Sequence, residues 1–149
     1  MIRFVTGDIL ETTAMAVVNP VNCVGVMGAG LAQQIKSKYP QCFSAYRRAC
    51  LARKVKVGLM HVWADAGREN GPRMVINFPT KVHWKDDSKL EYVQLGLKAL
   101  RASLVNHSIV SVAIPKLGCG LGKLDWNIVR SMIIQYLDDL PDVEIFVYG

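Results

Sequence analysis

Two glycine-rich segments contain the residues of this sequence that are best suited to binding an anion. Residues 24–30 and residues 115–122 each contain three glycines. Glycine permits positive φ and lets backbone N–H groups approach a phosphate closely, and a helix that starts beside such a loop adds its own free N–H groups. Each segment is therefore a candidate phosphate-binding loop, although glycine is also the ordinary residue of a turn. Neither has the spacing of a P-loop or of a dinucleotide-binding fingerprint, which argues against those two enzyme classes.

The cysteines and histidines do not form a metal or disulfide pattern. No C-x-x-C pair occurs, and the histidines are not spaced like zinc ligands. The residues concerned are Cys23, Cys42, Cys50, Cys119, His61, His83 and His107. The sequence therefore predicts no metal site. Free thiols, and a strand-like segment at residues 2–5 in place of a leader, predict a cytoplasmic protein.

The charge of the chain favours an anionic partner. Its 18 Lys and Arg exceed its 12 Asp and Glu, for a formal net charge of +6, although such an excess can also simply aid solubility. Residues 14–32 carry no charge, and their length is close to the roughly 20 residues of a membrane span. They contain two Asn, one Pro and three Gly residues, which fit a buried strand running into a glycine loop and argue against a membrane location.

Strand-like and helix-like patterns alternate along the chain, which is typical of an α/β layered domain. With 149 residues and no linker or repeat, residues 1–149 are predicted to form a single domain. Strands are expected at residues 2–5, 16–19, 59–64, 74–78, 110–114 and 143–148. Ligands of open α/β sheets bind beyond the carboxyl ends of the strands. The two glycine loops lie after the strands at 16–19 and 110–114, so they are placed where such a ligand would lie.

Four helices are expected, at residues 31–39, 43–51, 90–104 and 128–140. Ser88 with Glu91 forms a capping box at the start of the third helix, and Asp125 is suited to cap the fourth.

Together with their neighbours, the two loops resemble the macrodomain family of ADP-ribose-binding proteins. The resemblance covers almost the whole chain and rests on residues 6–9, 18–23 running into 28–32, 76–81 and 114–121, in that order. It implies a three-layer α/β/α macrodomain fold with a central mixed sheet of about six strands. Residues 77–84 and 120–126 look most like the DNA ADP-ribosyl glycohydrolase antitoxins of DarTG-type toxin–antitoxin systems. Those enzymes are similar to the terminal ADP-ribose protein glycohydrolase.

The resemblance implies an adenine site near the start of the chain. Asp8 would accept a hydrogen bond from the adenine amine, while the backbone N–H of Ile9 meets a ring nitrogen. Tyr148 would lie against the adenine face, as aromatic residues do with bases. The alternatives are a capping or ion-paired surface role for Asp8 and simple edge-strand packing for Tyr148.

The resemblance also implies that backbone N–H groups of both loops hold the diphosphate and the distal ribose. The residues concerned are Gly28, Ala29, Gly30, Leu31, Pro115, Gly118, Cys119, Gly120, Leu121 and Gly122. Cys119 is then a small loop residue rather than a nucleophile, because no base is placed to activate it.

Lys81 and Asn22 are the catalytic candidates that the resemblance implies. In the related enzymes a lysine at this position takes part in cleaving the glycosidic bond, and a lysine can attack the anomeric carbon only as the neutral amine. Pro79 favours an extended approach that carries Lys81 from the end of a strand toward the loops. Asn22 would hold the distal ribose hydroxyls or orient the reacting group, and it can also form a side-chain turn after Pro20.

The implied substrate is thymidine in single-stranded DNA that carries ADP-ribose. Thymine N3 departs as a delocalised imide anion, which needs less acid assistance than an alkylamine, and Gly122 stands where the terminal protein glycohydrolase has an acidic residue. His83 and Trp84 would recognise the base. Lys85 with Lys89, or the basic segment at residues 47–54, would follow the phosphates, although each basic cluster alone is also typical of a solvated face.

The implied partners are ADP-ribose, ADP-ribosylated DNA and a cognate ADP-ribosyltransferase toxin, with no cofactor, no membrane and a monomeric chain. Two other classes of function stay open. One is an ADP-ribose-binding module without turnover. The other is a hydrolase that acts on glutamyl or aspartyl ADP-ribose in proteins or on O-acetyl-ADP-ribose.

Overall fold

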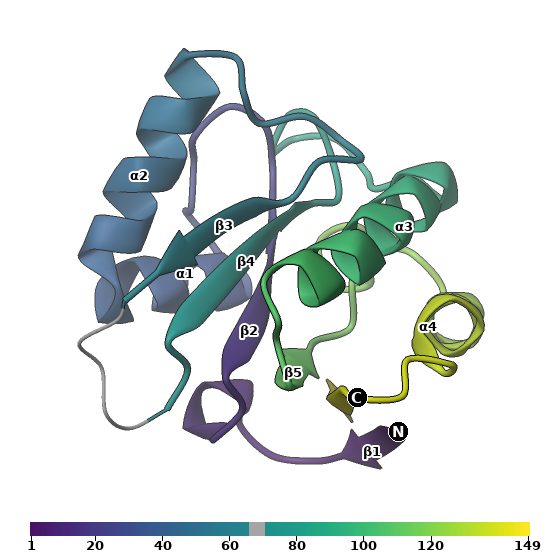
Figure 1. The fold of residues 1–149 in the computed structure, drawn as a ribbon. Helices are drawn as coiled ribbons and strands as arrows, with labels where there is room; N and C mark the ends of the chain where they lie inside the picture. The colour runs from purple at the N-terminus through teal and green to yellow at the C-terminus, as the bar shows by residue number, and fades with distance from the viewer. Residues whose placement is uncertain (66–70) are drawn as a thin grey trace.

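A computed structural model describes residues 1–65 and 71–149. Within these residues, six strands form one sheet in the order β1-β6-β5-β2-β4-β3 (Figure 1). The strands are β1 (Ile2–Val5), β2 (Ala16–Val21), β3 (His61–Ala64), β4 (Met74–Pro79), β5 (Ser111–Ile114) and β6 (Glu144–Tyr148). The edge strand β3 is antiparallel to β4, and the other neighbours are parallel. The mixed sheet predicted from the sequence is confirmed.

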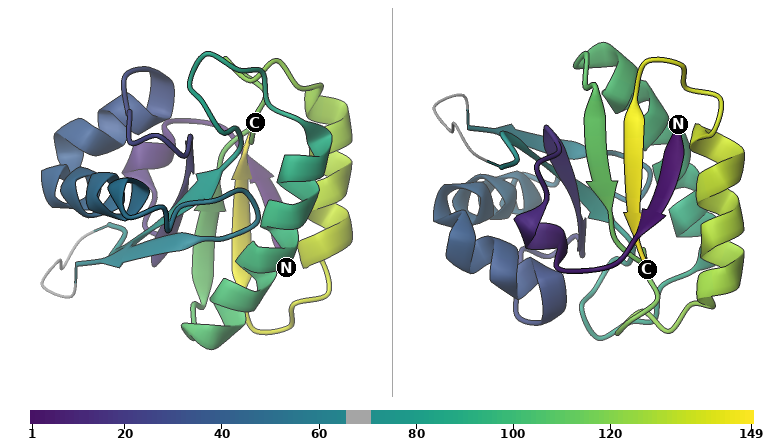
Figure 2. Two further views of the ribbon diagram at one scale, coloured as in Figure 1. Left: turned by 90° about the horizontal axis from the view of Figure 1, so that it is seen from above. Right: turned by 90° about the horizontal axis from the view of Figure 1, so that it is seen from below.

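Helices cover both faces of the sheet. They are α1 (Gly30–Lys38), α2 (Pro40–Leu51), α3 (Leu90–Asn106) and α4 (Trp126–Leu137), with a short 3-10 turn η1 (Ile9–Glu11) after β1. Figure 2 shows α1 and α2 on one face and α3 and α4 on the other, which confirms the three-layer α/β/α arrangement. No helix in the described ranges is both long and apolar enough to cross a bilayer.

The side chains of β2 alternate between two hydrophobic cores. Val17 packs in a cluster with Ile35 of α1, whereas Val18 packs in a larger cluster with Leu97 of α3 and Ile133 of α4. Successive side chains of a strand point to opposite faces of its sheet, so an uninterrupted apolar strand with helices on both sides buries both faces. This burial fixes the position of β2, and with it the position of the loop that follows.

The two predicted helix caps differ in outcome. Asp125 caps α4 as expected, because its Oδ1 accepts a hydrogen bond of 2.8 Å from the backbone N–H of Asn127. The capping box at Ser88 was a wrong prediction: α3 has Lys89 as its N-cap residue, with no side-chain cap bond. Ser88 is buried instead, and its backbone N–H donates to the carbonyl of Gly122 at 3.0 Å. Packing against the second glycine loop takes precedence here over local capping.

A row of polar side chains crosses the buried sheet beneath α1 and α2. Asn19 lies opposite Asn77 in the register of β2 and β4, and Asn77 lies opposite His61 in the register of β3. Asn19 Nδ2 donates to Asn77 Oδ1 at 3.0 Å, and Asn77 Nδ2 lies 3.0 Å from His61 Nδ1. Burial lowers the pKa of His61 below its ordinary 6.5. The row therefore depends on the neutral imidazole.

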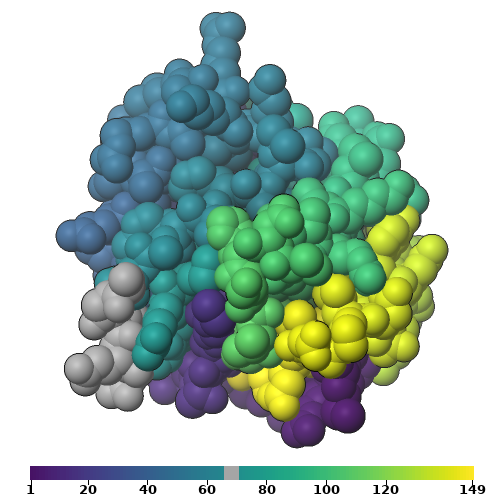
Figure 3. Space-filling view, viewed as in Figure 1, coloured from purple at the N-terminus to yellow at the C-terminus, as the bar shows by residue number. Residues whose placement is uncertain are grey.

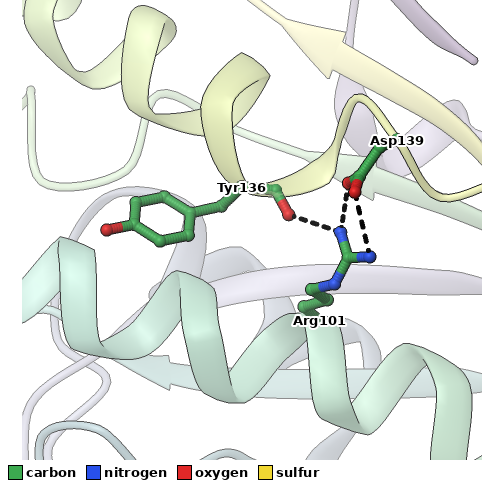
Figure 4. Close-up of polar contacts among 3 residues, drawn as sticks. All are labelled: Arg101, Tyr136 and Asp139. Atoms are coloured by element: carbon green, nitrogen blue, oxygen red, sulfur yellow. Dashed lines mark hydrogen bonds and ion pairs between the residues drawn. The ribbon is translucent and has the colours of Figure 1, made fainter.

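An exposed ion pair joins α3 to the turn after α4 (Figure 4). Arg101 pairs with Asp139 and also donates to the carbonyl of Tyr136 at 3.0 Å. Hydrogen bonding from the guanidinium lowers the pKa of Asp139. This contact lies on the far side of the sheet from α1 and α2.

Candidate functional site

The loops at the carboxyl ends of β2, β4 and β5 surround a cleft of ≈ 1180 Å³. Most of the residues predicted for ligand binding or catalysis line it. These are Asn22, Gly28, Ala29, Gly30, Leu31, Lys81, Trp84, Lys85, Pro115, Gly118, Cys119, Gly120, Leu121 and Gly122. Segments that are widely separated in the sequence therefore converge on one site, at the edge of the sheet where parallel strands end.

The three predicted adenine-binding residues lie beside the cleft rather than in its wall. Ile9, Leu31 and Tyr148 share one hydrophobic cluster, and Leu31 also lines the cleft. Asp8 is exposed, and its Oδ1 accepts a 2.9 Å hydrogen bond from Leu10 N, which caps η1. Asp8 therefore has the capping role that the sequence analysis gave as an alternative to adenine binding. No hydrogen bond within the described residues uses the second carboxylate oxygen, Oδ2, which leaves it open to a ligand.

Asn22 organises the first glycine loop (residues 24–30). Its Oδ1 accepts hydrogen bonds from Val24 N at 3.0 Å, Val26 N at 3.4 Å and the Tyr46 hydroxyl at 2.8 Å. Its Nδ2 donates to Val26 O at 2.8 Å. The amide oxygen is therefore fully engaged, and only the remaining N–H of Nδ2 is left for a substrate. The side-chain turn that the sequence analysis gave as the alternative role of Asn22 is present, and its hydrogen bonds position the first loop. The catalytic role of Asn22 stays a prediction.

The α2 helix supports this loop from behind. Gly25 has a φ of +86°, and a Cβ added to it would lie 3.5 Å from Arg47 Cγ and 3.6 Å from Cys50 Cβ. Tyr46 of the same helix is fully buried, and burial raises the pKa of its hydroxyl strongly, so that the group remains a hydrogen-bond donor to Asn22. The sequence analysis did not predict that Tyr46 supports the candidate site, because an aromatic residue on a helix usually indicates core packing alone.

The second glycine loop (residues 115–122) is closed tightly against Ser88. Gly118 has a φ of +71° and its carbonyl accepts a 2.9 Å hydrogen bond from Leu124 N. A Cβ added at Gly122 would lie 2.3 Å from Ser88 Oγ and 2.4 Å from Gly118 O. Glycine is thus required at 118 for its backbone conformation and at 122 for space.

Cys119 does not have the environment of a nucleophile. Burial raises the pKa of its thiol, with Lys116 acting in the opposite direction, and its Sγ lies 3.3 Å from Leu117 O as a donor. A protonated thiol is a poor nucleophile.

Lys81 lies in the wall of the cleft two residues beyond the end of β4. Its Nζ donates to the backbone carbonyl of Trp84 at 3.5 Å. Cys23 N donates to Val82 O at 2.8 Å, which ties this segment to the start of the first loop. The backbone around Lys81 is therefore held by the same strand end that carries Asn22.

Trp84 presents a half-exposed ring at the rim of the cleft. Its ring stacks on His83, with centroids 5.3 Å apart, and Lys85 Nζ lies 5.1 Å from its centroid. His83 is missing from the described residues that line the cleft, and its Nδ1 accepts a 3.1 Å hydrogen bond from Lys85 N. The structure thus brings Trp84 and Lys85 to the site, whereas His83 buttresses the Trp84 ring.

Two carboxylates that the sequence reasoning missed also line the cleft, and each is already engaged. Asp86 Oδ2 accepts a 3.2 Å bond from His83 N, and Asp87 pairs with Lys123 at 3.5 Å. Trp126 is a further missed lining residue; an aromatic at the first position of α4, directly after the capping Asp125, was the available signal. In the described part of the chain, no three His, Cys, Asp or Glu side chains gather as metal ligands.

A family model described as "Macro domain" matches residues 18–133. The chain belongs to the macrodomain family. This macrodomain is 46% identical, over 148 residues and 99% of its length, to a Mycobacterium tuberculosis (strain ATCC 25618 / H37Rv) protein named "DNA ADP-ribosyl glycohydrolase". The chain spans 42% of that relative's length.

Solved structures agree with this macrodomain closely. "Macrodomain of Mycobacterium tuberculosis DarG" superposes with a TM-score of 0.97 at 46% identity, covering 100% of this chain and 97% of the other. "Thermosipho africanus DarTG in complex with ADP-ribose" has a TM-score of 0.91 at 29% identity, covering 99% of this chain and 41% of the other. The macrodomain fold predicted from the sequence is confirmed.

Proposed function

We propose that this macrodomain removes ADP-ribose from thymidine bases of single-stranded DNA, by hydrolysing the N-glycosidic bond between the distal ribose and the base. The observation that carries the proposal is the position of Lys81 in the wall of a cleft formed by two glycine loops. The high identity to a relative named DNA ADP-ribosyl glycohydrolase supports the same substrate class.

The adenine of the ligand would lie against Tyr148, with its amine donating to Asp8 Oδ2. The diphosphate would lie between the glycine loops and accept hydrogen bonds from backbone N–H groups of these loops. This placement directs the distal ribose toward Asn22 and Lys81. The solved Thermosipho africanus DarTG complex contains ADP-ribose, which supports ADP-ribose as the bound part of the substrate.

The proposed reaction uses Lys81 as a nucleophile. Its neutral amine forms a bond to the anomeric carbon as the bond to thymine N3 breaks, and the electron pair leaves on the imide, which takes up the proton that the amine loses. Water then adds to the sugar adduct, which releases ADP-ribose and restores the amine. Asn22 contributes by keeping the first loop in place.

The absence of a side chain at Gly122 favours a thymine base over an alkylamine as the leaving group. The two carboxylates that line the cleft, Asp86 and Asp87, already accept from His83 and Lys123. An imide leaves without strong acid assistance, whereas an alkylamine does not. A carboxylate leaves at least as readily as an imide, so the comparison of substrates separates thymidine from an ester. A hydrolase of protein or O-acetyl esters of ADP-ribose and a module that only binds ADP-ribose are the competing functions.

We further propose that the cognate partner is an ADP-ribosyltransferase that modifies DNA, with this macrodomain as the antitoxin activity that reverses it. The similarity to a DarTG structure supports this pairing.

The deciding experiment compares three substrates with purified protein. These are a single-stranded oligonucleotide with ADP-ribosylated thymidine, a protein with glutamyl ADP-ribose, and O-acetyl-ADP-ribose. Release of ADP-ribose is measured for each, with binding of free ADP-ribose as the control for an intact site. Faster release from the oligonucleotide is expected. Faster release from either ester would replace the proposal, and binding without any release would leave a binding module.

A further inference from the structure

The net positive charge of this macrodomain comes from one stretch of the chain. Residues 12–64 contain seven of the 18 Lys and Arg and none of the 12 Asp and Glu. The rest of the chain therefore carries 11 basic and 12 acidic residues and is close to neutral. Solubility would be served by cations placed anywhere on the surface, whereas a segregated, acid-free stretch is the electrostatic pattern of a surface that binds an anion.

Five of these seven cations form a basic surface at the carboxyl end of α2 and the turn that follows it. They are Arg47, Arg48, Arg53, Lys54 and Lys56, and all five are exposed. Among the described residues none of the five takes part in an ion pair, whereas the ion pairs that are present involve Arg101 and Lys123. In the space-filling view of Figure 3, the blue region that contains α2 and this turn forms the upper part of the molecule.

The basic surface is continuous with the cleft through the first glycine loop. Gly25 backs directly on α2, with 3.5 Å between Arg47 Cγ and the position of an added Cβ. On the other side of Gly25, Val26 lines the cleft while remaining 40% exposed, and Val24 is 44% exposed. A chain leaving the cleft over this loop would therefore meet exposed apolar side chains first and unpaired cations next.

We propose that the basic surface binds the sugar–phosphate backbone of the single strand whose modified base lies in the cleft. The inference rests on the proposed function, because it assigns a path to that substrate. Exposed apolar side chains can contact bases, and arginine and lysine can neutralise phosphates and release counterions. A strongly acidic polypeptide such as poly-glutamate would be drawn by the same charge, but it has no bases to place on Val24 and Val26.

This path differs from the alternative cluster at Lys85 and Lys89. Lys85 Nζ is positioned over the Trp84 ring, Lys89 Nζ over the ring of Tyr92, and two acidic residues lie between these lysines in the sequence. The cluster is therefore neutral as a whole. The α2 side of the cleft, by contrast, offers cations without acidic neighbours in the sequence.

The test removes three charges from the basic surface without touching the site. The variant is Arg48→Gln, Arg53→Asn and Lys54→Gln; Arg47 is kept because its stem packs on the first loop. Asn is chosen at Arg53 because that residue has a φ of 57°, a conformation that Asn tolerates. The matched control removes three exposed cations elsewhere, with Arg3→Gln, Lys98→Gln and Arg130→Gln.

Binding is measured for an unmodified single-stranded oligonucleotide of about 15 nucleotides at increasing salt, and separately for free ADP-ribose and for a poly-glutamate peptide of similar charge. For the basic-surface variant, the log–log salt slope should become shallower by about 0.7 for each phosphate that the variant no longer neutralises. Its oligonucleotide affinity at low salt should fall at least tenfold. The control should keep the wild-type slope, and both variants should bind ADP-ribose normally.

An unchanged slope in the basic-surface variant would overturn the inference, and so would an equal loss of affinity in the control. The surface would be assigned to an acidic protein instead if wild type bound poly-glutamate as tightly as the oligonucleotide and the basic-surface variant bound neither. Because unmodified DNA is used, these outcomes are independent of turnover. If the protein fails to release ADP-ribose from a modified oligonucleotide, the proposed function is refuted. The binding of unmodified oligonucleotide still tests whether the basic surface binds DNA.

Discussion

The hydroxyl oxygen of Ser88 occupies the space in which a side chain at Gly122 would begin, 2.3 Å from the position of its Cβ. Ser88 Oγ is buried and has no hydrogen-bond partner among the described residues. The Ser88 backbone also holds the loop, through its 3.0 Å bond to Gly122 O. Position 122 is thus closed to side chains on the inner side of the second loop, which accounts structurally for the lack of an acid there.

Gly122→Ala should destabilise the protein by roughly 1 to 3 kcal/mol, because the new methyl group must displace Ser88 or the carbonyl of Gly118. Urea unfolding measures the free energy. The matched control is Gly120→Ala, where an added Cβ meets nothing within 4 Å, and its stability should stay near wild type. Equal stability of the two variants would mean that the loop relaxes freely.

Lys81→Ala should abolish release of ADP-ribose while binding of free ADP-ribose persists, because the loops carry most of the contacts. Lys81→Arg should be equally inactive, since a guanidinium keeps the charge but does not supply a neutral amine. Single-turnover rates and titration calorimetry separate the two effects. Substantial turnover by the arginine variant would exclude nucleophilic attack by this residue.

Asp8→Asn should weaken ADP-ribose binding by roughly 1 to 3 kcal/mol, as expected when a charged acceptor of a hydrogen bond is removed. Asn retains an oxygen that can accept from Leu10 N, so the cap of η1 is preserved. Asp8→Ala loses both roles and should also lower stability slightly. If Asp8→Asn binds ADP-ribose as well as wild type does, Asp8 has only the capping role.

Trp84→Ala should slow processing of the modified oligonucleotide by the equivalent of about 1 to 3 kcal/mol if its ring stacks on a base. Free ADP-ribose contains no thymine, so its affinity should remain nearly unchanged. Val82→Ala is the control, because Val82 is similarly exposed but lies outside the described lining of the cleft. Parallel losses in the two variants would point to a general disturbance of the segment.

The stability of the protein should decline as the pH falls below about 6.5, in part because of His61. Its pKa is lowered by burial, so the unfolded chain takes up a proton near pH 6.5 while the folded chain still holds the neutral ring. The stabilisation that comes from neutral His61 is complete above the pKa that this residue has in the unfolded chain. It is lost as the pH falls through the lower pKa that His61 has in the folded protein. His61→Gln should make the urea midpoint less dependent on pH between about 7.5 and 5, and an unchanged pH dependence would exclude this contribution of His61.

The sequence predicted the layers of this fold well, because their patterns are local. The apolar run of β2 and the cap at Asp125 both lie within a few residues of the elements that they define. Ser88 was misassigned because its partner, Gly122, is 34 positions away in the chain. A capping pattern carries no information about a loop that packs over it.

The site could be predicted in outline for a different reason. Glycine loops after parallel strands converge on one edge, and the resemblance assigned roles to them. Sequence reasoning could not find the support that Tyr46 gives to Asn22, nor the alignment of Asn19 with Asn77 and His61. Both depend on strand register and helix orientation, which arise only when the layers are assembled.

The hydrogen bonds that surround Asn22 have a consequence for the thermodynamics of association. A loop whose backbone N–H groups are already tied to a buried side chain and to α2 loses little conformational freedom when a diphosphate arrives. We therefore expect rapid, lock-and-key binding with a small unfavourable entropy change, and only minor changes in hydrogen exchange at Val24 and Val26 between the free and bound protein.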